Sequence, residues 1–159
     1  MHRALRSLLL LAVLGLAPWA ARADFVGRVV KVSDGDTLTV LVEQKQIKVR
    51  LDAIDAPELK QPFGRHAQES LAQLCAARNA RVVEKGHDRY GRTVGAIQCD
   101  GVDANAEQVR RGMAWVFVRY APRNSPLYGL QGEARGSRRG LWADPSPVAP
   151  WDWRLKGRS

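Results

Sequence analysis

The chain from residue 25 to residue 51 alternates apolar and polar positions with the two-residue period of β-strands. The run 25–32, FVGRVVKV, is rich in β-branched residues and predicts a first strand. The same alternation predicts a second strand over 37–42 and a third over 47–51. Between the first two strands, Asp34-Gly35 predicts a tight hairpin turn, because glycine tolerates the positive φ that such turns use. The chain therefore opens with a predicted three-stranded meander.

A helical spacing of apolar residues replaces this alternation between residues 66 and 78. Ala67 and Leu71 lie on one face of the predicted helix, and polar residues fill the positions between them. Two further short strands are predicted over 81–84 and 93–99, joined by a polar segment. This order places one helix between the third and fourth strands.

Two more helices are predicted after the fifth strand. Asn105 with Gln108 three residues later forms a capping-box pattern, and Gly112 is a suitable end for that helix. Ser125-Pro126 is a suitable start for the next helix, since serine caps and proline is tolerated in the first turn. Gly140 is the predicted end of this third helix.

Five short strands in this order, with about three helices, predict an α+β fold that is mainly β. The arrangement suits a five-stranded barrel of the oligonucleotide/oligosaccharide-binding (OB) type. Barrels of this type often present one face to oligonucleotides. Nucleic acid is therefore a partner to test against the remaining features of the sequence.

The first 23 residues have the pattern of a secretory signal peptide. Two arginines precede an apolar run over 8–20, and Ala21-Arg22-Ala23 follows as a cleavage site. A membrane anchor is the alternative, but the run is shorter than the roughly 20 residues that a spanning helix needs. We expect cleavage after Ala23, export to the periplasm or the medium, and no stable membrane association afterwards.

The remaining chain divides into one domain over 24–143 and a C-terminal tail over 144–159. The tail contains three prolines and is expected to lie over the surface. A domain of this length can bury one sizeable core, and nothing in the sequence requires more than a monomer.

The chain carries a formal charge of +9, with 25 basic and 16 acidic residues. A basic balance favours polyanionic partners but is weak evidence alone. The two cysteines are Cys75 and Cys99. Export would favour a disulfide between them, and two buried free thiols are the alternative.

Acidic residues gather within a basic protein at two predicted strand ends. Asp36 begins the second strand, Asp55 ends the third, and Glu58 comes three residues later. Like charges that close repel each other, so a bound cation is a natural explanation. A carboxylate-bound cation is also what phosphodiester hydrolysis uses, together with a base and positive charge on the reacting phosphate. The alternative is that these aspartates are ordinary turn residues, which we prefer for Asp34.

Three motifs together resemble the thermonuclease, or staphylococcal nuclease-like, family from about residue 25 to residue 142. They are Asp34-Gly35-Asp36-Thr37, the segment RLDAIDAPE over 50–58, and Asp88-Arg89-Tyr90-Gly91-Arg92. Any one of them occurs by chance, whereas all three in this order form a specific pattern. The resemblance implies the OB-type barrel predicted above.

The resemblance also implies a metal site. Asp36 and Asp55 match the family's carboxylate ligands, and the backbone carbonyl of Ala56 matches a further ligand. The family often has threonine where Ala56 stands, and a carbonyl ligand survives that change. Calcium is the expected ion, because it prefers hard oxygen ligands.

The resemblance gives catalytic roles to three further residues. Glu58 matches the general base that activates water, and Arg50 and Arg92 match the two arginines that hold the scissile phosphate. A guanidinium suits that task because its fork donates two parallel hydrogen bonds.

Three residues match positions that line the family's nucleotide pocket: Arg89, Tyr90 and Tyr120. Aromatic faces can stack on bases with little sequence preference. For the two tyrosines, packing at the rim of the core is an equal alternative.

The resemblance therefore implies an exported, calcium-dependent nuclease acting on DNA and RNA with little sequence specificity and leaving 3′-phosphate ends. One alternative is a binding module of the same fold without catalysis. It is disfavoured because the acidic and arginine positions are all occupied. A basic structural protein on extracellular polyanions would explain the charge but not the acidic cluster.

Overall fold

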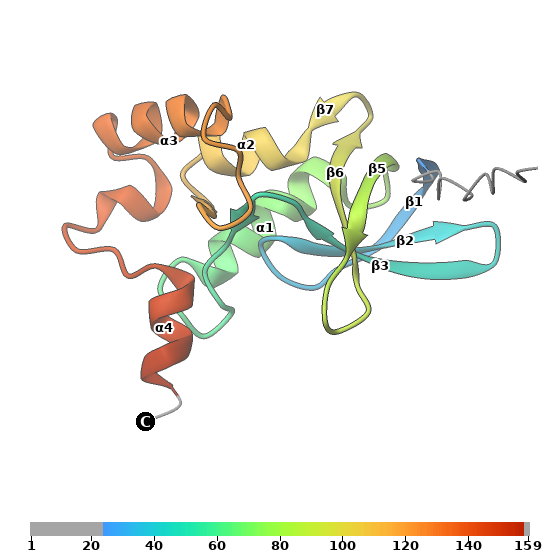
Figure 1. Ribbon diagram of the computed structural model, residues 1–159, viewed down its shortest axis with the longest axis horizontal. Coiled ribbons are helices and arrows are strands. Elements are labelled where there is room, and N and C mark those ends of the chain that lie inside the picture. Colours follow the sequence, from blue (N-terminus) through green and yellow to red (C-terminus); the bar gives the residue numbers. More distant parts are fainter. Residues whose placement is uncertain (1–23, 158–159) are drawn as a thin grey trace, which may run out of the picture.

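The computed structural model describes residues 24–157, and five of its strands form a closed barrel (Figure 1). Four antiparallel pairings run in the order β3-β2-β1-β5-β6, and a parallel pairing of β3 with β6 closes the ring. The predicted five-stranded α+β barrel is confirmed. Its strands are β1 (Phe25–Val32), β2 (Thr37–Val42), β3 (Lys45–Leu51), β5 (Asn79–His87) and β6 (Thr93–Cys99).

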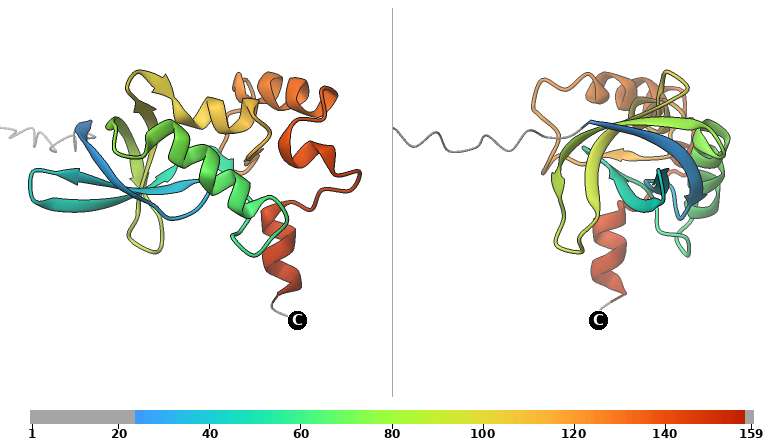
Figure 2. Two further views of the ribbon diagram at one scale, coloured as in Figure 1. Left: turned by 180° about the vertical axis from the view of Figure 1, so that it is seen from behind. Right: turned by 90° about the vertical axis from the view of Figure 1, so that its right-hand side faces the viewer.

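Helices and three short strands lie beside one end of the barrel (Figures 1 and 2). Two-residue strands β4 (Ile54–Asp55) and β8 (Trp115–Val116) pair with each other, and β7 (Val102–Asp103) extends the sheet beyond β6. The helices are α1 (Gly64–Cys75), α2 (Ala104–Arg110), α3 (Leu127–Gly136), a 3-10 turn (Gly140–Ala143) and α4 (Pro150–Lys156).

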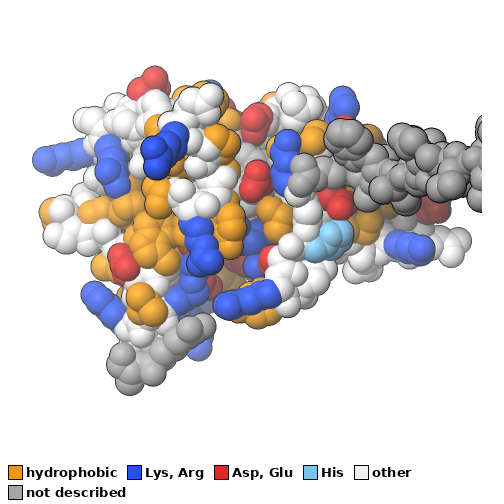
Figure 3. All heavy atoms as spheres, viewed as in Figure 1, with side chains coloured by type: hydrophobic (Ala, Val, Ile, Leu, Met, Phe, Trp, Pro, Cys, Tyr) orange, Lys and Arg blue, Asp and Glu red, His pale blue; other side chains and the backbone are white. Residues whose placement is uncertain are grey.

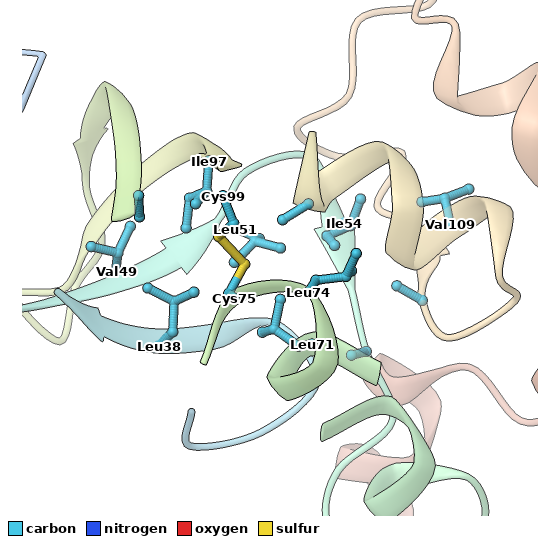
Figure 4. Close-up of a cluster of buried hydrophobic side chains, with 14 of the residues drawn as sticks. Leu38, Val49, Leu51, Ile54, Leu71, Leu74, Cys75, Ile97, Cys99 and Val109 are labelled. Carbon is cyan, nitrogen blue, oxygen red and sulfur yellow. A yellow bond between two sulfur atoms is a disulfide. The ribbon is translucent and has the colours of Figure 1, made fainter. Parts of the chain in front are cut away.

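The core fills the barrel and continues between the barrel and α1 (Figure 4). Barrel side chains such as Leu38, Val49 and Leu51 are fully buried, and Leu71 of α1 packs among them. Burying each such leucine contributes about 1.5–3 kcal/mol. The helical spacing that predicted α1 is therefore the spacing of its buried face.

The start of α2 differs from the prediction. Asp103, not Asn105, caps the helix, and its side chain accepts a hydrogen bond from Ala106 N at 2.9 Å. Asn105 is buried instead, where its amide accepts from Ile97 N at 3.0 Å and donates to Asp52 O at 2.9 Å. Buried backbone groups of the barrel need partners, and this tertiary demand overrides the local capping pattern.

The end of α3 and the structure of the tail also differ from the prediction. Helix α3 ends at Gly136, while Gly140 takes a φ of 56° at the start of the 3-10 turn. The tail forms a fourth helix, α4, whose N-terminal residues Ala149 and Pro150 are buried. Gln61 donates to Val148 O at 2.7 Å and ties the tail to the domain.

The predicted signal peptide, residues 1–23, lies outside the described residues, as do the last two residues of the tail. Across residues 24–157, every helix is too short or too polar to span a bilayer.

A disulfide joins the end of α1 to the end of β6 (Figure 4). Cys75 and Cys99 are fully buried, with Cα atoms 5.2 Å apart and a sequence separation of 24. The bond therefore links the C-terminal end of α1 covalently to the C-terminal end of the barrel strand β6.

Replacing both cysteines, as Cys75→Ala with Cys99→Ala, is expected to lower the free energy of unfolding by about 3 kcal/mol. A loop of this length restricts the unfolded chain by that order of magnitude. Urea unfolding followed by circular dichroism measures the change. Equal midpoints for both proteins, with the parent kept under non-reducing conditions, would contradict it.

Candidate active site

A cleft of about 1180 Å³ opens between the barrel, the β5–β6 loop and α4. In Figure 1 this loop and α4 extend toward the same side of the molecule. In Figure 3, Lys and Arg side chains gather over this region, with acidic side chains among them. The cleft is lined by every residue for which a site role was predicted: Asp36, Arg50, Asp55, Ala56, Glu58, Arg89, Tyr90, Arg92 and Tyr120.

Asp36 is held immediately before β2 by hydrogen bonds on both carboxylate oxygens. Oδ1 accepts from the Thr37 hydroxyl and Oδ2 from Ala56 N, both at 3.0 Å. Asp36 N donates to Asp34 Oδ1 at 3.0 Å, so Asp34 acts as the turn residue predicted for it. The side chain of Asp36 therefore has a single defined direction.

The turn before Asp36 requires glycine for a reason other than the one predicted. Gly35 does not adopt a positive φ. A Cβ atom there would stand 2.5 Å from the Cβ of Ala67 and 2.7 Å from that of Ala56. Close packing of the turn against α1 excludes a side chain, so the predicted positive φ was wrong.

Gln108 stabilises the same turn by hydrogen bonds from its side chain. This fully buried side chain donates from Nε2 to Gly35 O at 2.6 Å and to Ala67 O at 2.9 Å. It therefore links α2, α1 and the turn. No sequence pattern predicted this role, since Gln108 was expected to take part in capping the helix.

Asp55 lies in β4, a separate strand after a turn, rather than at the end of β3. Pairing of Asp55 with Trp115 of β8 fixes its backbone, and the residue is 1% exposed. In the β2–β3 ladder, Thr37 stands opposite Arg50, which brings the Asp36 end of one strand beside the Arg50 end of the other. Arg50 Nη2 then lies 2.9 Å from Asp55 Oδ1 and 3.4 Å from Asp36 Oδ2.

Burial and mutual repulsion set the protonation of these groups. Burial raises the pKa of Asp55 despite its arginine partners. Burial and the neighbouring charge of Asp36 raise the pKa of Asp34 to about 6. Burial alone would lower the pKa of Arg50, but Asp36 and Asp55 outweigh it, and the pKa is raised. The acidic pair thus has a strong demand for positive charge.

The donor set suits a hard divalent cation. Oxygens of Asp36 and Asp55 converge on one cationic nitrogen of Arg50, and both carboxylates are buried. Ala56 is adjacent, held by its N–H to Asp36 Oδ2. Within residues 24–157, no three His, Cys, Asp or Glu side chains form a metal cluster by themselves. A cation here would need backbone or water oxygens besides the two aspartates, as calcium commonly accepts.

Glu58 lies at the mouth of the cleft, on a turn that the fold holds firmly. Its N–H donates to Gln61 Oε1 at 3.1 Å, and its carbonyl accepts from Gln61 N at 2.8 Å. A Cβ on Gly64 would stand 1.9 Å from Glu58 O, so α1 must begin with a glycine here. The Glu58 side chain is 44% exposed and accessible to water.

The β5–β6 loop aims Arg92 by means of Asp88. Asp88 Oδ1 accepts from Tyr90 N at 2.9 Å and Arg92 N at 3.0 Å, and Gly91 takes a φ of 76°. Asp88 Oδ2 accepts from Arg92 Nε at 2.6 Å, while Arg92 Nη1 lies 3.4 Å from Thr37 Oγ1. Partial burial raises the pKa of Asp88, but these bonds outweigh it and lower the pKa overall. The terminal nitrogens of Arg92 therefore point toward the acidic pair.

The three residues predicted to line a nucleotide pocket stand at the rim. Tyr90 and Tyr120 are 67% and 58% exposed, so both rings lie at the surface of the cleft. The Arg89 guanidinium lies 4.8 Å from the ring centre of Tyr90. Phe117 packs edge-on to Tyr120 and stacks on Trp151 of α4, adding two aromatic rings to the cleft wall.

Arg154 of α4 is the main residue that the sequence did not predict in the cleft. It contacts Asp55 Oδ2 at 2.6 Å and Glu58 Oε1 at 2.8 Å. Burial would lower the pKa of Arg154, but hydrogen bonds to these carboxylates outweigh it and raise the pKa. A helix signal was present: Pro150 in the first turn, Asp152 after it, and Arg154 and Lys156 in the last turn.

Comparison with known proteins agrees with this geometry. The family model described as "Staphylococcal nuclease homologue" matches residues 48–144, more than half of the chain. The chain is 43% identical to a micrococcal nuclease of Shigella flexneri over 158 residues, which is 93% of this chain and 91% of the relative. It is 45% identical to an uncharacterized endonuclease of Escherichia coli O157:H7, over 83% of this chain and 86% of the relative. It is 42% identical to Protein ParB of Escherichia coli, over 98% and 93%. The chain therefore belongs to the staphylococcal nuclease family.

Proposed function

We propose that this protein is a calcium-dependent nuclease that hydrolyses phosphodiester bonds in DNA and RNA with little sequence specificity. The observation that carries the proposal is the meeting of five groups in one cleft. Two buried carboxylates, a half-exposed glutamate and two arginines line it together: Asp36, Asp55, Glu58, Arg50 and Arg92. The nuclease and endonuclease names of the relatives agree with this activity.

Asp36, Asp55 and the carbonyl of Ala56 would hold the calcium ion. When bound, the ion would neutralise charge on the phosphate and orient the reacting groups. The burial of both aspartates favours a cation, because two unneutralised carboxylates in a low-dielectric site are costly. Two carboxylates also leave room for water among the ligands.

Glu58 would take the proton from the attacking water. Its side chain is the most exposed of the acidic groups that face the reaction site, which lets water reach it. The hydrogen bonds to Gln61 hold its backbone in place. Attack on phosphorus with loss of the 5′-oxygen would leave 3′-phosphate ends, as the family resemblance implies.

Arg50 and Arg92 would hold the scissile phosphate from two sides. Arg50 belongs to a barrel strand and contacts both acids, whereas Arg92 belongs to the β5–β6 loop and reaches Thr37, which contacts Asp36. The rim residues Arg89, Tyr90 and Tyr120 would contact the rest of the nucleotide. Stacking on exposed rings tolerates any base, which agrees with low sequence specificity.

The proposal includes export and a monomeric state. The leader over 1–23 has the order of a signal peptide, which would place the enzyme in the periplasm or the medium. A non-catalytic binding module of the same fold is the second candidate. It would retain the basic cleft, and the following experiments separate the two.

Digestion of double-stranded DNA, single-stranded DNA and RNA is expected with calcium and not with chelator. Gel analysis of products follows cleavage, and resistance of their 3′ ends to extension until phosphatase is added identifies 3′-phosphates. If no divalent ion supports cleavage while salt-sensitive binding persists, the binding module is the correct function.

Glu58→Gln is expected to reduce kcat at least a hundredfold with nucleic-acid binding largely unchanged, because the variant lacks a proton acceptor. Glu69→Gln is a matched control, since Glu69 is exposed on α1 outside the cleft. Near-normal turnover in Glu58→Gln would exclude Glu58 as the base.

Arg50→Lys is expected to lower kcat/KM by about tenfold or more, because an ammonium group cannot replace the bidentate fork. Single-turnover cleavage measures the change, and Arg65→Lys on the exposed side of α1 is its control. Equal rates for the parent and Arg50→Lys would remove Arg50 from phosphate binding.

A further inference from the structure

Arg154 occupies the position where the proposed site most needs a cation. Its Nη2 lies 2.6 Å from Asp55 Oδ2, and its Nη1 lies 3.3 Å from Asp55 Oδ1 and 2.8 Å from Glu58 Oε1. One guanidinium thus binds both oxygens of a proposed metal ligand and one oxygen of the proposed base. The contact spans 99 residues in sequence and comes from a helix outside the matched family region.

Asp55 and Glu58 cannot bind Arg154 and a divalent cation at the same time without weakening one of the two interactions. Asp55 already accepts from Arg50 at 2.9 Å, so Arg154 is the second guanidinium on one buried carboxylate. A further dication would add repulsion among three positive groups over short distances. Arg154 also occupies one of the two carboxylate oxygens of Glu58, the proposed base.

We propose that Arg154 is an internal counter-cation that occupies Asp55 and Glu58 in the metal-free protein and is displaced when the divalent cation binds. This rests on the proposed metal dependence of the same site. Release of Arg154 would then free both the metal ligand and the base in one step. Calcium binding and the position of Arg154 are coupled, and the coupling is reciprocal.

The structure allows the release without unfolding the tail. The first turn of α4 is anchored by buried Ala149 and Pro150 and by Trp151, which stacks on Phe117 with ring centres 5.4 Å apart. The last turn is held differently: Leu155 is 63% exposed, and the side chain of Arg154 is 37% exposed. Arg154 can therefore leave when the last turn of α4 frays.

The polar contacts that the structure gives the Arg154 side chain are its ion pairs with Asp55 and Glu58, so replacing it tests this role directly. Calorimetric titration of calcium chloride into the full mature protein, without nucleic acid, measures affinity independently of activity. Arg154→Gln is expected to bind calcium about 5–150-fold more tightly than the parent, the usual range for coupled sites. Arg154→Lys should fall between them, since it keeps the charge but loses the fork. Lys156→Gln is the control, an exposed cation on the same helix outside the cleft.

A second measurement uses only the parent protein. Amide hydrogen exchange over 150–157 is expected to increase when calcium is added, while the barrel strands become equally or better protected. This readout remains valid if an Arg154 variant fails to fold.

The outcomes separate the two proposals. Calcium affinity in Arg154→Gln that is equal to or weaker than that of the parent would overturn the displacement while leaving metal dependence intact. Exchange in α4 that is unchanged or slowed by calcium would do the same. If neither protein binds a divalent cation, the proposed metal dependence fails and the displacement fails with it.

Discussion

Two buried carboxylates, Asp36 and Asp55, line the cleft, and their negative charge must be compensated by the residues around them. An ionised pair in this setting is tolerable only with hydrogen bonds and counter-charge. The structure supplies both, through Thr37 and the Ala56 N–H for Asp36 and through Arg50 and Arg154 for Asp55. A site arranged this way is suited to exchanging one cation for another.

The barrel holds these carboxylates in place by means of strand pairing and close packing. The β2–β3 register sets Asp36 beside Arg50, and the β4–β8 pair sets Asp55 beside both. Underneath, Gln108 binds the turn at Gly35, where α1 leaves no space for a side chain. The positions of Asp36 and Asp55 are thus set by the strands and turns of the barrel.

The second arginine on Asp55, Arg154, comes from outside the barrel. Helix α4 anchors its first turn by aromatic packing on Phe117 and presents Arg154 from its last turn. A cation carried on a short helix end is easier to displace than one carried on a strand, because fraying affects few contacts. Under the proposed displacement, Arg154 would neutralise the acidic pair before the metal ion binds, and the ion would neutralise it afterwards.

The sequence by itself determined the local structure and the identities of the residues in the cleft. Period-two and helical spacing located the five barrel strands and α1, and the three motifs identified the acids and arginines, because these signals depend on neighbours in the chain. The sequence did not predict the roles of Asn105, Gly35 and Arg154, because their partners lie far away in sequence. A buried backbone group, a close approach of α1 and an unneutralised carboxylate decided those positions. Each is a demand of packing and electrostatics that exists only once the chain has folded, so only the tertiary structure could assign them.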